Sequence, residues 1–123
     1  MSLLLQNIID ASVSRSNRWH KGDFNSWSLL EWAGAMAGEA GEACNAAKKV
    51  KRLEDKIPSI NETKRHFTDV GDAKFQVAKE VADTILYGVM VAARAGFNSE
   101  EIESIVREVF NKKSIEYGFP ERI

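Results

Sequence analysis

Two pairs of acidic residues, each inside an otherwise apolar segment, most constrain what this chain can fold into. The first pair is Glu39 and Glu42, in the alanine- and glycine-rich stretch 37–43, and the second is Glu80 and Asp83. Residues three positions apart share one face of an α-helix, so each pair points to one side of a predicted helix. Because unpartnered buried carboxylates are costly, these residues, called the four acids below, predict a fold that gathers them around positive charge.

Helical patterning extends over most of the chain. Apolar residues recur at helical spacing in four segments, and no segment alternates as a strand does. The predicted helices cover about residues 2–17, 27–51, 72–95 and 98–116. The polar segment 52–71 is predicted to be a long loop with a short helical turn near 62–67. We therefore predict an all-α, four-helix bundle-like fold that forms one domain over residues 1–123.

Local signals refine these helices. Asn98 and Glu101 have the spacing of a capping box, and Gly96 fits the position just after a helix end. Glycines inside the second helix are costly, and we expect them to allow close approach by another helix or a ligand; they are Gly34, Gly38 and Gly41. The predicted buried faces of the last two helices consist of Phe75, Val77, Val81, Ile85, Val89, Ala92, Ile102, Ile105, Val106, Val109 and Phe110.

The composition excludes several classes of function. The 123 residues are 44% hydrophobic and 28% charged, with a formal net charge of −1, so no basic excess indicates nucleic-acid binding. The apolar runs are too short or too charged to span a membrane, and the N-terminus lacks the pattern of a signal peptide. The lone Cys44 fits a reducing compartment. We expect a cytoplasmic protein with neither nucleic-acid nor membrane partners.

The positive charge that the four acids require is best supplied by a hard divalent metal ion. The basic residues considered as partners are too few and too long to neutralise a compact cluster; they are Lys48, Lys49, Arg94 and Arg107. A di-iron bundle places histidine three residues after glutamate, and the chain has only His20 and His66. Zinc also lacks suitable ligands. Oxygen ligands favour Mg²⁺ or Mn²⁺, and Mg²⁺ bound by carboxylates points to phosphate chemistry.

The arrangement Glu39-x-x-Glu42 followed by Glu80-x-x-Asp83 resembles the MazG-like, all-α nucleoside triphosphate pyrophosphohydrolases. These are related to the all-α dUTPases and dCTP pyrophosphatases. The resemblance covers about residues 26–120 and is strengthened by the Gly-Glu-Ala-Gly-Glu run at 38–42, by Tyr87 and by Asn111. It implies the MazG-like fold and magnesium-dependent hydrolysis between the α and β phosphates, which yields a nucleoside monophosphate and pyrophosphate.

The resemblance also assigns roles to residues. The four acids would be catalytic and would hold two or three Mg²⁺ ions, for which Mn²⁺ can substitute, and one glutamate would orient or deprotonate the attacking water. Arg107 and Asn111 match phosphate-contacting positions. Further substrate-binding candidates are Lys48, Tyr87, Lys112 and, near the base, Trp27, with Trp19, Phe24 and Trp32 as other stacking candidates. The alternatives are structural: an aromatic that closes the bundle for Tyr87, a helix-dipole partner for Lys48, and core for the tryptophans.

Partners follow from the same considerations. Relatives assemble as dimers or tetramers, and helices this apolar exceed what a small monomer covers, so we expect a homo-oligomer and favour a tetramer. The substrate would be a (deoxy)nucleoside triphosphate. A phage-type relative, acting in the host cytoplasm, would convert dGTP to dGMP. The competing hypothesis is a non-catalytic helical oligomerisation or interaction module with a structural metal site.

Overall fold

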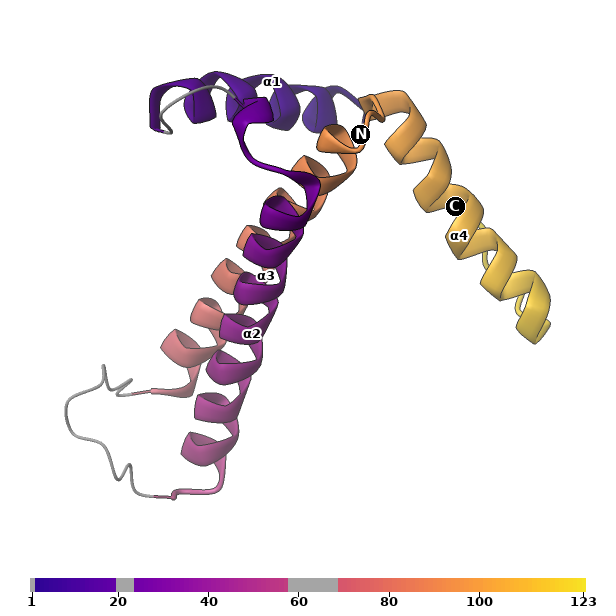
Figure 1. Cartoon of the computed structure of the whole chain (residues 1–123). Helices are drawn as coiled ribbons and strands as arrows, with labels where there is room; N and C mark the ends of the chain where they lie inside the picture. Colours follow the sequence, from indigo (N-terminus) through magenta and orange to yellow (C-terminus); the bar gives the residue numbers. More distant parts are fainter. Residues whose placement is uncertain (1, 20–23, 58–68) are drawn as a thin grey trace. The chain divides into compact units, whose positions relative to one another are not determined.

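The computed structural model describes residues 2–19, 24–57 and 69–123. These residues form α-helices and one short 3-10 helix, and none of them lies in a strand, which confirms the all-α class (Figure 1). The elements are α1 (Ser2–Trp19), η1 (Phe24–Ser26), α2 (Leu29–Glu54), α3 (Val70–Arg94) and α4 (Ser99–Tyr117). The predicted helical turn near 62–67 lies outside the described residues.

The helix boundaries differ from the predicted ones around the long connection. Helix α2 begins at Leu29 rather than at Trp27, and it continues to Glu54. Helix α3 begins at Val70, before the predicted start, because the Asp69 carboxylate accepts a hydrogen bond of 2.7 Å from the backbone N–H of Asp72. Such a cap satisfies a free donor of the first turn, so the helix can begin beside Gly71. The connection is therefore shorter than predicted at both ends.

The two capping predictions are confirmed at the α3–α4 junction. The Asn98 side chain accepts a hydrogen bond of 2.9 Å from the Glu101 backbone N–H, and the Glu101 carboxylate accepts one of 3.1 Å from the Asn98 N–H. Gly96, just after α3, has a φ of +102°, which glycine adopts without steric cost. The sequence therefore determines where α4 begins.

The chain divides into two compact units, residues 1–30 with 89–123 and residues 31–88. The predicted single domain over residues 1–123 stays a prediction. In the first unit, α1 packs against α4 and η1. The Ser99 hydroxyl, which is buried, donates to the Gln6 side chain at 2.7 Å. The backbone N–H of Phe24 donates to the Asn17 side chain at 3.1 Å.

The second unit is an antiparallel pair formed by α2 and α3, which lie side by side (Figure 1). The rings of Trp32 and Tyr87 lie 6.1 Å apart between centroids. Further along α2, the Met36 sulfur lies 3.6 Å from the position that a Cβ on Gly88 would take. Trp32 on α2 and Ala73 on α3 are buried and contribute to the core of this unit. The helices that carry the four acids are therefore packed against each other.

The predicted core is only partly correct. Val89 and Ile102 are buried, as predicted. The other large apolar residues of α3 and α4 in that prediction are mostly exposed, each by 42–65%; these are Phe75, Val81, Ile85, Ile105, Val106, Val109 and Phe110. The apolar faces extend further around these helices than their neighbours within the same unit cover.

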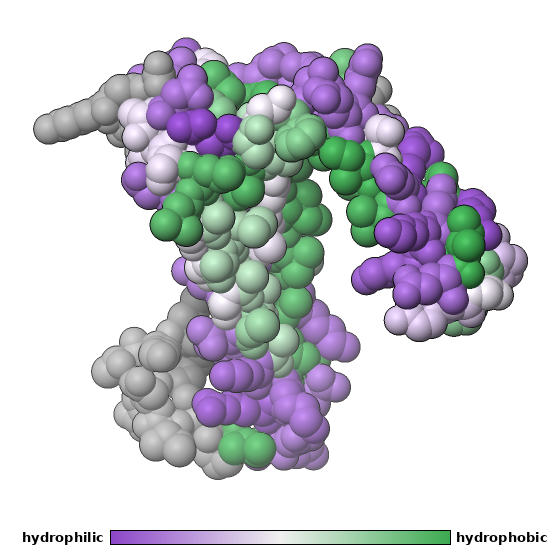
Figure 2. Space-filling view, turned by 45° about the vertical axis from the view of Figure 1, so that its right-hand side comes forward, coloured by the Kyte–Doolittle hydropathy of each residue, from purple (hydrophilic) through white to green (hydrophobic). Residues whose placement is uncertain are grey.

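The surface shows the same excess of apolar side chains. Figure 2 shows hydrophobic residues along the α2–α3 pair, with hydrophilic residues gathered towards the end where α2 finishes. Within the described residues, no helix combines the length and the apolar character that a membrane span requires.

Candidate metal centre

Three carboxylates converge on the α2–α3 pair. Glu39 lies on α2, and Glu80 and Asp83 lie one turn apart on α3. Each offers a carboxylate oxygen, and these oxygens all lie within 4.8 Å of one another. Glu39 and Glu80 are half-buried and Asp83 is exposed. We call these three residues the carboxylate triad. The two acidic pairs of the sequence thus meet, because the antiparallel packing brings their faces together.

The fourth acid, Glu42, lies outside the carboxylate triad. It is exposed, one turn after Glu39 on α2. Its charge and a hydrogen bond between the two side chains nevertheless act on Glu39. The structure therefore separates the four acids into three that converge and one neighbour.

The electrostatics of Glu39 reflect this crowding. Burial, followed by the negative charge of Glu42, raises the pKa of Glu39 above its ordinary value. The charges of Asp83 and Glu80 act in the same direction. All these contributions disfavour the ionised form, so a bound cation would relieve a repulsion that already exists in the protein.

Two of the basic residues predicted as possible partners of the four acids, Arg94 and Arg107, contact other groups. The Arg94 guanidinium donates to the backbone carbonyls of Trp27 and Asn25, at 2.9 and 3.4 Å. Arg107 forms an ion pair of 3.0 Å with Glu103. The ion pairs Lys51–Asp55 and Arg107–Glu103 involve none of the four acids. The donor set is thus carboxylate oxygen, which suits Mg²⁺ or Mn²⁺.

The α2 glycines, Gly34, Gly38 and Gly41, do not contact a neighbouring helix. A Cβ added at any of the three would meet no described atom within 4 Å. The expectation that they allow close approach by a helix is therefore wrong for α3, the described helix that pairs with α2 in the same unit. Because Gly38 and Gly41 flank Glu39 and precede Glu42, they leave the helix surface beside these acids open.

The predicted substrate residues outside α4 have different surroundings. Tyr87 is half-buried and its ring packs on Trp32, which agrees with the alternative of an aromatic that closes the pair. Lys48 is exposed near the end of α2. Trp27 is half-buried and precedes α2, so it is not on the helix predicted for it. Phe24 is buried beside α1, and Trp19 has no described side chain.

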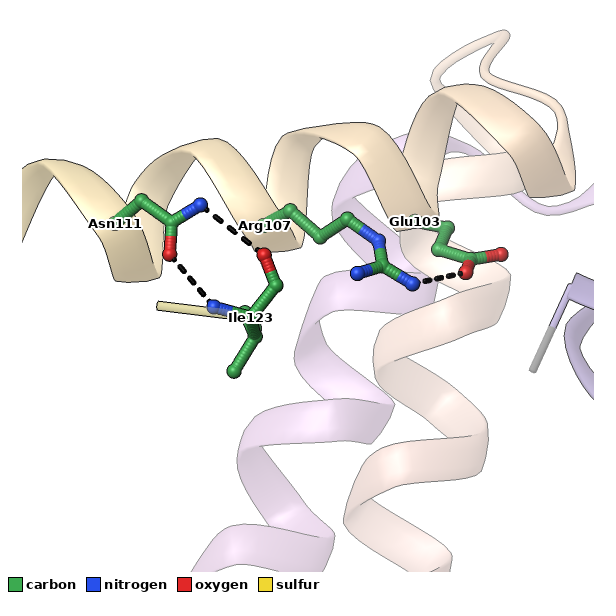
Figure 3. Close-up of polar contacts among 4 residues, drawn as sticks. All are labelled: Glu103, Arg107, Asn111 and Ile123. Atoms are coloured by element: carbon green, nitrogen blue, oxygen red, sulfur yellow. Dashed lines mark hydrogen bonds and ion pairs between the residues drawn. The ribbon is translucent and has the colours of Figure 1, made fainter. Parts of the chain in front are cut away.

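The three candidates on α4 belong to the first unit, whereas the four acids belong to the second. Figure 3 shows Asn111 paired with the main chain of Ile123: its amide nitrogen donates to the carbonyl oxygen at 3.2 Å and its oxygen accepts from the N–H at 2.9 Å. Arg107 points to Glu103 in the same view. Lys112 is exposed. If Asn111 bound a phosphate, its side chain would therefore have to give up its two hydrogen bonds with Ile123.

Gln76 is a neighbour of the carboxylate triad that the sequence analysis missed. Its amide nitrogen donates to a carboxylate oxygen of Glu80 at 2.6 Å. The signal was present in the sequence, because Gln76 stands four residues before Glu80, a spacing at which helical side chains meet.

The sequence and the structure were also compared with known proteins. No family model, curated protein or solved structure matches this chain. The resemblance to the MazG-like enzymes thus rests on the motif residues.

Proposed function

We propose that this chain is a magnesium-dependent nucleoside triphosphate pyrophosphohydrolase with the MazG-like four-helix fold. The observation that carries the proposal is the carboxylate triad, in which both acidic motifs contribute oxygens within 4.8 Å of one another. The pKa of Glu39, raised by burial and by the neighbouring acids, also supports a cation in this place.

The residues divide the chemistry between them. Glu39, Glu80 and Asp83 would hold Mg²⁺, which would supply Lewis-acid stabilisation for the charge of the triphosphate. Glu42, the acid left outside the carboxylate triad, accepts the proton of the attacking water. The water oxygen bonds to the α-phosphorus, the bond from that phosphorus to the bridging oxygen breaks, and pyrophosphate leaves. The second product is the nucleoside monophosphate, and dGMP from dGTP is the narrowest form of the proposal.

The experiment is incubation with each (deoxy)nucleoside triphosphate and Mg²⁺ or Mn²⁺, with separation of monophosphate and pyrophosphate. We expect turnover that requires the metal. We also expect Glu39→Gln and Asp83→Asn each to reduce turnover at least about 100-fold, because a metal ion supplies several kcal/mol to the transition state. Glu54→Gln on α2 and Asp72→Asn on α3 are matched controls. Absence of turnover with every nucleotide would exclude the enzyme, and intact turnover in the two variants would exclude the metal ligands.

A homo-oligomer, preferably a tetramer, is part of the proposal. Its support is the set of exposed apolar residues on α3 and α4. The same observation favours the second candidate function, a non-catalytic oligomerisation module in which the carboxylate triad binds a structural ion. The two candidates differ in one measurement, because only the enzyme releases pyrophosphate.

A further inference from the structure

Glu80, a member of the carboxylate triad, accepts two hydrogen bonds from side chains of its own helix. Its side chain accepts the hydrogen bond of 2.6 Å from Gln76, and its backbone carbonyl accepts one of 2.9 Å from the Thr84 hydroxyl. Both interactions are partly buried, and both donors lie one turn from Glu80. Of the two, only the bond from Gln76 restrains the Glu80 carboxylate, because Thr84 bonds the backbone carbonyl.

The carboxylate of Glu80 needs such a restraint more than that of Asp83. A glutamate side chain has one more rotatable bond than aspartate, so more conformational freedom is lost when a ligand fixes it. Gln76 provides such a restraint for Glu80 on α3.

The chemical type of the donor also matters. An ionised carboxylate has about four acceptor positions on its two oxygens, and one amide N–H occupies one of them. The remaining positions stay available to a cation. Gln76 adds no charge, whereas a lysine or arginine at this position would neutralise the cluster and compete with the cation. A neutral donor therefore orients the carboxylate and preserves the negative potential around it.

We propose that Gln76 is a positioning residue that fixes the Glu80 carboxylate for the divalent metal ion; this inference rests on the proposed function. Metal ligands generally depend on such hydrogen-bond partners, and their loss reduces metal affinity about 10- to 100-fold. A pair of the same kind exists in the other unit, where Gln6 donates to Asp10 at 2.8 Å and also accepts from the buried Ser99 hydroxyl. That pair supplies an internal comparison.

The test measures Mn²⁺ binding to the full chain by calorimetry and by electron paramagnetic resonance. We expect Gln76→Ala to weaken Mn²⁺ binding about 10- to 100-fold. We expect Asp10→Ala, which breaks the comparison pair and keeps the Gln6–Ser99 hydrogen bond, to leave it unchanged. Gln76→Lys retains a donor that reaches Glu80, so we expect this variant to fold at least as stably as the parent in chelator. Its Mn²⁺ affinity should nevertheless fall below that of Gln76→Ala, which a purely structural role for Gln76 does not predict.

The outcomes separate this inference from the proposed function. If the parent binds Mn²⁺ and Gln76→Ala binds it equally well, Gln76 has no positioning role although the metal site stands. If Gln76→Lys binds as well as the parent, the charge argument is wrong. If the parent binds no Mn²⁺, or if Asp83→Asn binds as tightly as the parent, the metal site itself fails and this inference with it.

Discussion

The Glu39 side chain faces the other acids of the cluster, and burial and their charge raise its pKa. A raised pKa means that the folded, metal-free protein binds more protons than the unfolded chain between the two pKa values. The free energy of unfolding therefore falls as the pH rises from the unfolded pKa of Glu39 through its folded pKa. We expect this loss in denaturant titrations with chelator, and we expect it to diminish in Glu39→Gln.

Saturating Mg²⁺ provides the complementary measurement. The ion requires the ionised carboxylates, so metal binding competes with protonation and stabilises the protein more as the pH rises. Glu116→Gln on α4 is the control, since it alters one exposed acid outside the cluster. A pH dependence that Glu39→Gln leaves unchanged would show that Glu39 is not its source.

Tyr87 allows ring and hydroxyl roles to be separated. Its ring packs on buried Trp32, so Tyr87→Ala should destabilise the α2–α3 pair. Because Tyr87 is half-buried, we expect a cost below the roughly 3–5 kcal/mol of a fully buried aromatic residue. Tyr87→Phe retains the ring contact and removes the hydroxyl. If the hydroxyl binds phosphate or sugar, we expect a rise in KM of about tenfold, as for one lost hydrogen bond to a charged group, with an unchanged melting temperature. Unaltered kinetics would leave Tyr87 with its packing role alone.

At the scale of the helix, the open glycine face of α2 makes a distinct prediction. No described atom lies near the Cβ positions of Gly38 and Gly41, so alanine fits there and should stabilise the helix by up to about 1 kcal/mol each. If metal-bound triphosphate approaches this face, the same substitutions raise KM while the melting temperature rises. Gly34→Ala, one turn further from the acids, should stabilise without affecting KM. If all three variants have the same KM as the parent, these glycines have no role in substrate binding.

Elements and their ends were predictable where one local interaction determines them. The Asn98–Glu101 capping box and the left-handed Gly96 are complete within a few residues, so spacing alone predicted them. The start of α3 was predicted two residues too late because the polar segment 52–71 shows no helical period, although Asp69 caps a helix that begins at Val70. The convergence of the two acidic pairs followed from burial cost and helical spacing. Gln76 was missed because the argument from the cost of burying charge concerns only charged residues, and Gln76 is neutral.

The organisation of the whole molecule was less predictable. The faces of α3 and α4 that were predicted to be buried show why. A helical stripe of apolar residues indicates that something covers it, but not whether the cover comes from the same chain or from another copy. Val106 and Val109 are 55% and 54% exposed, whereas Ile102 on the same helix is buried. The apolar pattern is thus continuous in the sequence, although the cover within the chain is not.

This discontinuity gives the last prediction, which concerns assembly. If a second copy covers α4, Val109, which is 54% exposed, moves from water into an interface and contributes at most about 1.5 kcal/mol. A glutamate at this position would add the cost of burying an unpaired charge. A two-fold symmetric interface contains each contact twice. Val109→Glu should therefore weaken association at least about 100-fold and yield monomers in sedimentation velocity at concentrations where the parent is oligomeric. Glu108→Lys, at the exposed neighbouring position, changes charge without removing apolar area and should assemble as the parent does. A parent that is monomeric throughout the concentration series, or a Val109→Glu variant that assembles normally, would mean that α4 does not form the interface.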